Sequence, residues 1–171
     1  MSESKHELIA AALQDALSSI PGDGGDNYWY TYRVGRTVTF GSEDLDTSIG
    51  MPLIVLSPGE ETMAEGESGD PTAGFSVNAA AEFFAMLCVY VGSLEEDAWK
   101  QDGADSRWLI ANRMVKDFLK KLFSDVQLGS LVENVAKDEI VIDRRRFTVG
   151  LDWVLVEVRF VVQYTLLSGD P

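Results

Sequence analysis

The sequence predicts an α+β domain with a mostly antiparallel, twisted sheet and helices packed on one of its faces. From Val154 to Leu166 every even position is apolar, which is the period-two pattern of a strand with one buried face. The expected elements run in the order helix, strands, helices, strands, so the two kinds are segregated along the chain rather than alternating. A chain of 171 residues can bury one core, and we expect a single domain over residues 1–171.

A helix is expected from Glu7 to Ile20. Ser4 followed by Glu7 matches a capping box, in which the serine side chain satisfies a backbone N–H group at the start of the helix. Apolar residues then recur at helical spacing on one face, namely Ile9, Ala12, Leu13, Ala16, Leu17 and Ile20. Pro21-Gly22 ends the helix.

Two strands and an acidic segment are expected next. One face of Asn27 to Phe40 carries mostly aromatic and apolar side chains, which predicts a long strand with a bend or bulge at Gly35. Met51 to Leu56 is a short buried strand that ends at Ser57-Pro58-Gly59. Residues 60–74 contain five acidic and four glycine or proline residues and almost no large apolar group, so we expect an acidic mobile loop over 59–74. Its acids are Glu60, Glu61, Glu65, Glu67 and Asp70.

The middle of the chain predicts a central strand followed by a helix. Glu82 to Val91 is apolar on both faces, as in a strand covered on both sides, whereas Ala79 to Ala81 just before it also suits a helix. Ser93 and Glu96 form a second capping box, which predicts a short helix to about Gln101.

The C-terminal third predicts further helices and strands. A long helix is expected from Ser106 to Phe123, and lysines in its last turns complement the helix dipole. Its apolar face consists of Trp108, Ala111, Val115, Leu119 and Leu122. A short helix is expected over Leu128 to Val135, and a strand over Glu139 to Val149. The 13 residues from Val154 to Leu166 would span about 43 Å at roughly 3.3 Å per residue, so we expect this strand to extend past its own subunit's core or to line a shared sheet.

Charge is unevenly distributed along the chain. The net charge is −14; residues 1–106 hold 19 acidic and 4 basic residues, and residues 107–171 hold 9 and 10. Because an acidic protein repels nucleic-acid phosphates, sequence-specific DNA binding is not expected. Three interpretations of the acidity stay open: solubility, a surface past which DNA moves without adhering, and a mimic of DNA that occupies a basic site on a partner.

The sequence offers little that predicts catalysis, a cofactor or a metal. The single histidine, His6, is expected to be exposed on the first helix, and no Gly-x-Ser-x-Gly elbow or phosphate-binding loop is present. Cys88, the single cysteine, lies in an apolar run and is expected to be a buried, inert thiol. One histidine and one cysteine cannot form the usual zinc site, and Asp44 and Asp46 lack the rest of a calcium loop. We therefore expect neither enzymatic activity nor a cofactor.

The run Arg144-Arg145-Arg146 is the one basic cluster in an acidic chain. Two interpretations are open. The arginines form a solvated strand edge that prevents sheet-to-sheet aggregation, or they dock on the acidic half of a neighbouring subunit or another partner. The second interpretation favours head-to-tail association, which closes into a ring when the rotation per subunit permits.

In its overall layout the chain resembles the bacteriophage tail terminator family, also called tail-completion proteins. The resemblance is carried by the amphipathic helix from Glu7 to Ile20, the strand ending in Met-Pro-Leu-Ile-Val-Leu-Ser-Pro-Gly, the strand Leu-Cys-Val-Tyr-Val-Gly, and the long helix after it. The closing strand Val-Glu-Val-Arg-Phe-Val-Val-Gln-Tyr-Thr-Leu-Leu, followed by Gly-Asp-Pro near the end, completes it. The acidic segment from Glu60 to Gly74 and the Tyr28-Trp29-Tyr30 cluster are not part of the pattern.

The resemblance implies a structural virion protein assembled in the host bacterial cytoplasm, without membrane contact. Its subunits would form a homo-hexameric ring that caps the tail tube, ends tail polymerisation and joins the tail to the head connector or neck protein. DNA would pass through the lumen without specific binding, and the lumen acids are expected among Glu60, Glu61, Glu65, Glu67 and Asp70. Another neck or head–tail joining protein, or an acidic DNA-mimicking inhibitor, are the alternatives.

Overall fold

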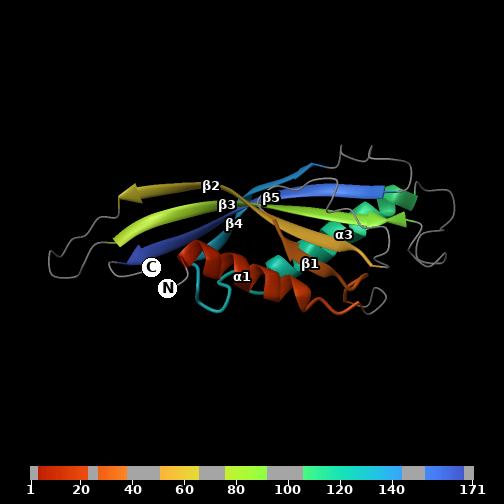
Figure 1. The fold of residues 1–171 in the computed structure, drawn as a ribbon, viewed down its shortest axis with the longest axis horizontal. Helices are drawn as coiled ribbons and strands as arrows, with labels where there is room; N and C mark the ends of the chain where they lie inside the picture. The colour runs from red at the N-terminus through yellow and green to blue at the C-terminus, as the bar shows by residue number, and fades with distance from the viewer. Residues whose placement is uncertain are drawn as a thin grey trace.

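The computed structural model describes residues 4–22, 27–37, 51–65, 76–91, 106–143 and 153–167. These residues form an α+β fold, with two helices and one five-stranded sheet in the order β1-β2-β3-β5-β4 (Figure 1). The elements are α1 (Lys5–Ser18), β1 (Arg33–Arg36), β2 (Leu53–Glu65), β3 (Ser76–Tyr90), α3 (Ser106–Leu122), β4 (Asn134–Asp143) and β5 (Trp153–Leu167). The α+β class is confirmed. The sheet is mixed, because β1 runs parallel to β2 while the other neighbours are antiparallel.

The pair β3–β5 is the centre of the sheet. The two strands, 15 residues each, pair without a register shift from Ser76↔Leu167 to Tyr90↔Trp153. The long final strand therefore finds its partner inside its own chain, and the prediction that it outruns its subunit's core is wrong. The physical reason is that β3 is equally long, because Ala79 to Ala81 continue the strand instead of forming a helix.

One face of the sheet and both helices share a single hydrophobic core. Phe160 on β5 lies between Phe83 on β3 and Phe118 on α3, with ring centroids 5.9 and 5.7 Å away. The even positions of β5 from Val154 to Tyr164 are all buried in this core, as their period-two pattern predicts. A smaller buried cluster occupies the other face and consists of Leu53, Val55, Met86, Cys88 and Leu155. Cys88 is thus buried, as expected.

Helix α1 begins as its capping box predicts. Ser4 is the N-cap, and its side-chain oxygen accepts a hydrogen bond from the backbone N–H of Glu7. The apolar face of the helix is buried through Ile9, Ala10, Leu13, Leu17 and the following Ile20. Neither of the two helices that the structure describes is long and apolar enough to cross a membrane.

The segment before β1 is held by a buried carboxylate instead of by strand pairing. The expected strand from Asn27 is wrong over its first part, since pairing begins only at Arg33. The side chain of Asp117 on α3, only 1% exposed, accepts hydrogen bonds from the backbone N–H groups of Trp29 (2.8 and 3.0 Å) and Tyr30 (3.0 Å). The Tyr32 hydroxyl donates a further bond of 3.0 Å to the same carboxylate. One buried side chain therefore accepts hydrogen bonds from three groups of this segment, two backbone N–H groups and one hydroxyl.

Burial and hydrogen bonding act in opposite directions on this carboxylate. Burial raises the pKa of Asp117 above its ordinary value, and the N–H groups of Trp29 and Tyr30 and the hydroxyl of Tyr32 offset part of the rise by stabilising the anion. Burial also raises the pKa of Tyr32 well above its ordinary value, so this hydroxyl remains a donor at neutral pH.

Side chains of α3 cover the same segment from outside. The Arg113 guanidinium lies 3.9 Å from the centre of the Trp29 ring, and the Lys120 ammonium lies 5.0 Å from that of Tyr28. Lys120 also donates to the backbone and side-chain oxygens of Asn27, each at 3.0 Å. The aromatic cluster that the sequence placed on a strand is therefore packed against a helix.

Strand β2 continues far beyond its expected end. Ser57-Pro58-Gly59 does not end the strand but produces a register shift between Pro58 and Glu61, after which pairing with β3 continues to Glu65. Gly59 is needed at this bulge, because a Cβ there would lie 2.8 Å from the Phe84 ring and 2.8–2.9 Å from the Glu82 side chain. The acidic loop expected over 59–74 is thus wrong up to Glu65, and residues 66–75 lie outside the described residues.

Two further expectations about α3 and β4 are corrected. Trp108 is 52% exposed, so the buried face of α3 is turned away from it and consists of Ile110, Ala111, Met114, Val115, Phe118 and Leu122. No helix forms over 128–135: Leu128, Gly129 and Ser130 all have positive φ angles, and β4 begins at Asn134. The helix expected over 93–101 and the continuation of β4 beyond Asp143 lie outside the described residues.

Replacing Asp117 tests whether the carboxylate holds the 27–32 segment. Asp117→Asn keeps the size of the side chain but replaces one acceptor oxygen by an NH₂ group that faces N–H and O–H donors. We expect the free energy of unfolding to fall by about 2–4 kcal/mol, because each buried donor left unpaired costs about 1–3 kcal/mol. Chemical denaturation at neutral pH measures this loss. The exposed Asp15→Asn is the matched control and should change stability by less than about 0.5 kcal/mol; an equally small effect at Asp117 would contradict its anchoring role.

Candidate functional site

A groove runs between the N-terminal half of α1 and the outer edge of β2. We call it the edge groove; its volume is about 480 Å³, within the range of ligand and peptide sites. It is lined by His6, Glu7, Ala10 and Gln14 from α1, Arg36 and Thr37 at the end of β1, Leu56, Ser57 and Pro58 from β2, and Phe83 from β3. These four elements meet beside Arg36 and Thr37, the last residues described after β1.

Among the described residues, only the first part of the outer edge of β2 has a partner strand. Strand β1 pairs with β2 only along Leu53 to Leu56, and the last bond of that pairing runs from the N–H of Thr37 to the carbonyl of Leu56, 2.9 Å. From Ser57 to Glu65 no strand among the described residues pairs with the outer edge of β2. Such an edge presents unpaired N–H and C=O groups on which another extended segment can add as a strand.

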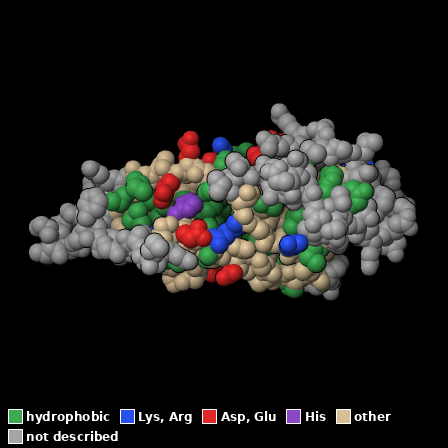
Figure 2. Space-filling view, in the orientation of Figure 1, with side chains coloured by type: hydrophobic (Ala, Val, Ile, Leu, Met, Phe, Trp, Pro, Cys, Tyr) green, Lys and Arg blue, Asp and Glu red, His purple; other side chains and the backbone are tan. Residues whose placement is uncertain are grey.

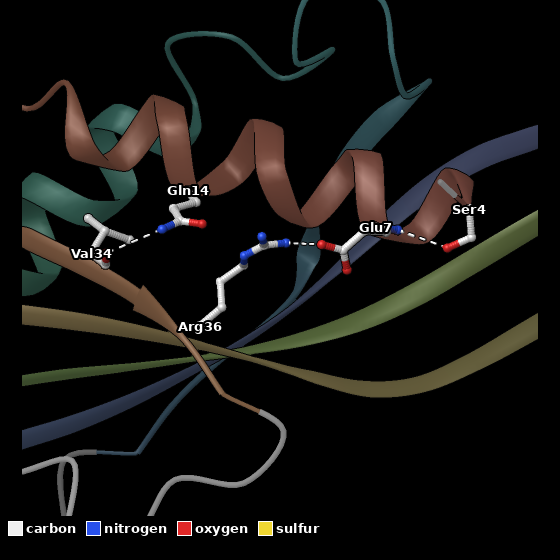
Figure 3. A network of polar contacts seen from close by, with 5 residues as sticks. All are labelled: Ser4, Glu7, Gln14, Val34 and Arg36. Carbon is white, nitrogen blue, oxygen red and sulfur yellow. Dashed lines mark hydrogen bonds and ion pairs between the residues drawn. The ribbon is translucent and has the colours of Figure 1, made fainter. Parts of the chain in front are cut away.

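Polar contacts fix helix α1 as one wall of the groove (Figure 3). Glu7, in the first turn, forms an ion pair with Arg36, and the Gln14 side-chain amide donates to the backbone carbonyl of Val34 over 3.4 Å. The ion pair is solvent-accessible, with side-chain exposures of 36% for Arg36 and 48% for Glu7. These contacts span from α1 to β1 and hold the helix beside the strand edge.

The floor of the groove is apolar, and its rim is charged. His6 stacks on Phe83 with ring centroids 5.0 Å apart, and Phe83 and Leu56 are themselves buried core residues. In the space-filling view, hydrophobic side chains surround the histidine, with acidic and basic side chains beside it (Figure 2). The expectation that His6 is simply exposed on its helix is therefore corrected: it is partly buried and covers the floor of the groove.

The edge of β2 beyond the groove is acidic and exposed. Glu60 and Glu61 are both exposed, and the Tyr164 hydroxyl donates to Glu61. A second hollow, of about 350 Å³, lies across the sheet from β2 to the turn before β4, and its lining includes Thr62, Met63, which is 62% exposed, and Glu133. This part of β2 therefore carries both exposed carboxylates, Glu60 and Glu61, and an exposed apolar side chain, Met63.

The structure brings together only some of the residues that the sequence singled out. Glu60, Glu61 and Glu65 lie on β2, whereas Glu67, Asp70 and the run Arg144-Arg145-Arg146 lie outside the described residues. In the described ranges, no group of three or more histidine, cysteine, aspartate or glutamate side chains is arranged to hold a metal ion.

The edge groove itself was not predicted from the sequence. Its helix wall follows from the capping box at Ser4, but the strand edge depends on where β1 ends and how far β2 continues. Both depend on pairing between segments distant in the chain, and the acidic composition of 59–65 suggested a loop instead.

No protein-family model and no curated protein matches this sequence. The edge groove and the acidic strand edge beside it are therefore the features from which a function is argued.

Removing the Glu7–Arg36 ion pair tests whether this contact between α1 and β1 stabilises the fold. Arg36→Gln deletes one charge of an exposed pair, and such pairs contribute about 0–1 kcal/mol. We expect the free energy of unfolding to change by less than about 1 kcal/mol in thermal or chemical denaturation. Phe83→Ala, at the buried floor of the same groove, should lower the free energy of unfolding by about 3–5 kcal/mol. This variant is the comparison for a side chain on which the core depends. A loss of similar size for Arg36→Gln would mean that the pair holds the fold together.

Proposed function

We propose that this protein is a structural subunit of a bacteriophage-type tail, a tail terminator that forms a ring. The observation that carries the proposal is the outer edge of β2 from Ser57 to Glu65, with which no strand of the described ranges pairs, in a sheet whose central strands β3 and β5 pair along their whole length. A sheet edge of this length is an aggregation hazard in a protein that acts alone, whereas in an assembly subunit a neighbour covers it. The resemblance in layout to the tail terminator family supports the same class.

The proposed ring is a homo-hexamer that caps the tail tube and joins it to the head connector. Head-to-tail contacts place two different surfaces of each subunit together, and they close into a ring when the rotation per subunit permits. The charge distribution suits a conduit, because 19 acidic against 4 basic residues over positions 1–106 repel the phosphates of passing DNA. The role is structural, with no cofactor, and places the protein in the virion after assembly in the bacterial cytoplasm.

The mass of the protein in solution tests the proposal. Light scattering behind a sizing column, over a series of protein and salt concentrations, should give a hexamer or a monomer that converts to one. A monomer that assembles only after purified tail tubes are added also agrees with the proposal, since charged interfaces can order on a template. A monomer or dimer that ignores tail tubes and instead competes with DNA for a basic protein would contradict it and favour an acidic inhibitor.

A further inference from the structure

The outward side of α3 carries a cluster of lysines in an otherwise acidic protein. Lys116 and Lys120 are exposed and four residues apart, so they lie next to each other on one side of the helix. Phe123 follows three residues later on the same side, and the ammonium of Lys137 on β4, also exposed, lies 5.1 Å from the centre of its ring. We call Lys116, Lys120 and Lys137 the lysine face.

The positive charge of the lysine face is not neutralised by the part of the chain that the structure describes. Within those ranges no carboxylate forms an ion pair with its three lysines, whereas Arg36 pairs with Glu7 and Arg159 pairs with Glu82. Acids are not scarce, since the chain has 28 acidic and 14 basic residues. The one acid of α3, Asp117, is buried and accepts its hydrogen bonds on the inner side of the helix. Exposed cations in this setting suit a surface whose counter-charges are on another molecule.

Contacts within the protein position the lysines of this face. The Lys120 ammonium donates to the backbone and side-chain oxygens of Asn27, each at 3.0 Å, and lies 5.0 Å from the centre of the Tyr28 ring. An ammonium group has three donors, so one N–H of Lys120 remains for a partner. A side chain that is already positioned loses less conformational freedom when it binds.

The distribution of charge along the chain favours a second copy as the partner. Residues 1–106 hold 19 acidic and 4 basic residues, so each subunit carries an excess of the charge that the lysine face attracts. Two lysine faces repel each other, and the net charge of −14 repels nucleic acid. The acidic half of another copy meets neither obstacle.

Two adjacent carboxylates lie on the other side of the sheet from the lysine face. Glu60 and Glu61 are both exposed on β2. Helix α3 packs on β5, and Lys137 lies on the edge strand β4, which is three strand spacings, roughly 14 Å, from β2. Since an ion pair requires contact, these carboxylates and the lysine face meet only between two copies.

We infer that the lysine face of one subunit binds the carboxylates of Glu60 and Glu61 of the next copy. This inference rests on the proposed ring, to which it adds the two contacting surfaces. Because the two surfaces differ and lie toward opposite sides of the sheet, the contact is head-to-tail, the type that closes into a ring. It assigns Glu60 and Glu61 to the contact between subunits instead of to the lumen.

Charge reversal on the lysine face tests the inference. Lys116→Glu with Lys137→Glu leaves the contacts of Lys120 with Asn27 and Tyr28 in place. In sedimentation velocity over a series of protein and salt concentrations, this variant should need at least about tenfold more protein to assemble than the unaltered chain. The difference should shrink as salt is added, because salt screens the charges.

Two further variants complete the experiment. Lys5→Glu with Arg33→Glu makes the same change in net charge outside the lysine face and should assemble as the unaltered protein does. Glu60→Lys, which leaves the contact between Glu61 and Tyr164 in place, should weaken assembly, and mixing it with the lysine-face variant should restore mixed assemblies. Circular dichroism and the melting temperature of each variant confirm that it is folded.

The outcomes separate this inference from the proposed function. Rings that form equally well in the lysine-face variant would overturn the inference and leave the ring proposal standing. Binding of a labelled DNA oligonucleotide that this variant loses, with assembly unchanged, would overturn it in favour of nucleic acid. Assembly that stops at a dimer and depends on the lysines would support the inference and contradict the ring. An unaltered protein that never assembles, even on tail tubes, would contradict both.

Discussion

The continuous pairing of β3 with β5 is the constraint on which the rest of the structure depends. Fifteen residues of each strand are in register, and β5 buries every even side chain from Val154 to Tyr164. Since a shift of one residue would turn all of these side chains to the opposite face, the hydrophobic pattern fixes the register. The buried face then determines where α1 and α3 pack, through the contacts of Phe160 with Phe83 and Phe118.

The length of this central pair also creates the candidate site. Strand β2 follows β3 to Glu65, and in the part of the chain that the structure describes only Arg33 to Arg36 pair with its outer side. The hydrogen bonds that Asp117 accepts from Trp29, Tyr30 and Tyr32 explain why β1 begins only after Tyr32, because these three residues are held against α3. A buried carboxylate on one helix thus determines where the first strand of the sheet begins.

The charge of the chain agrees with this picture of an assembly subunit. The acidic half supplies β2 and the wall of the edge groove, and the one run of arginines follows β4 in the sequence. Complementary charges on two different surfaces favour head-to-tail contacts and disfavour pairing of like edges.

Local patterns predicted the parts of the fold that depend on local physics. The capping box and helical spacing located α1, and the period-two pattern located β5 and its buried face. The extensions of β2 and β3 were missed because acidic residues, glycine and alanine favour loops or helices, and only pairing across the sheet makes them strands. No sequence pattern singled out Asp117, and nothing near it in sequence indicates that the N–H groups of Trp29 and Tyr30 donate hydrogen bonds to it. For the same reason the edge groove could not be predicted, and Glu60 and Glu61, named from the sequence as acids of a loop, lie on β2 instead.

Amide hydrogen exchange of β2, compared between the assembled protein and the dissociated subunit, tests the central claim most directly. If a neighbouring copy covers the free edge, amides between Glu61 and Glu65 that do not face β3 should exchange more slowly on assembly. Amides of Ala79 to Ala81, which already lie between β2 and β5, should change little. Assembly that leaves the exchange of the β2 edge as fast as in the free subunit would contradict the account, because the edge would still be open to water.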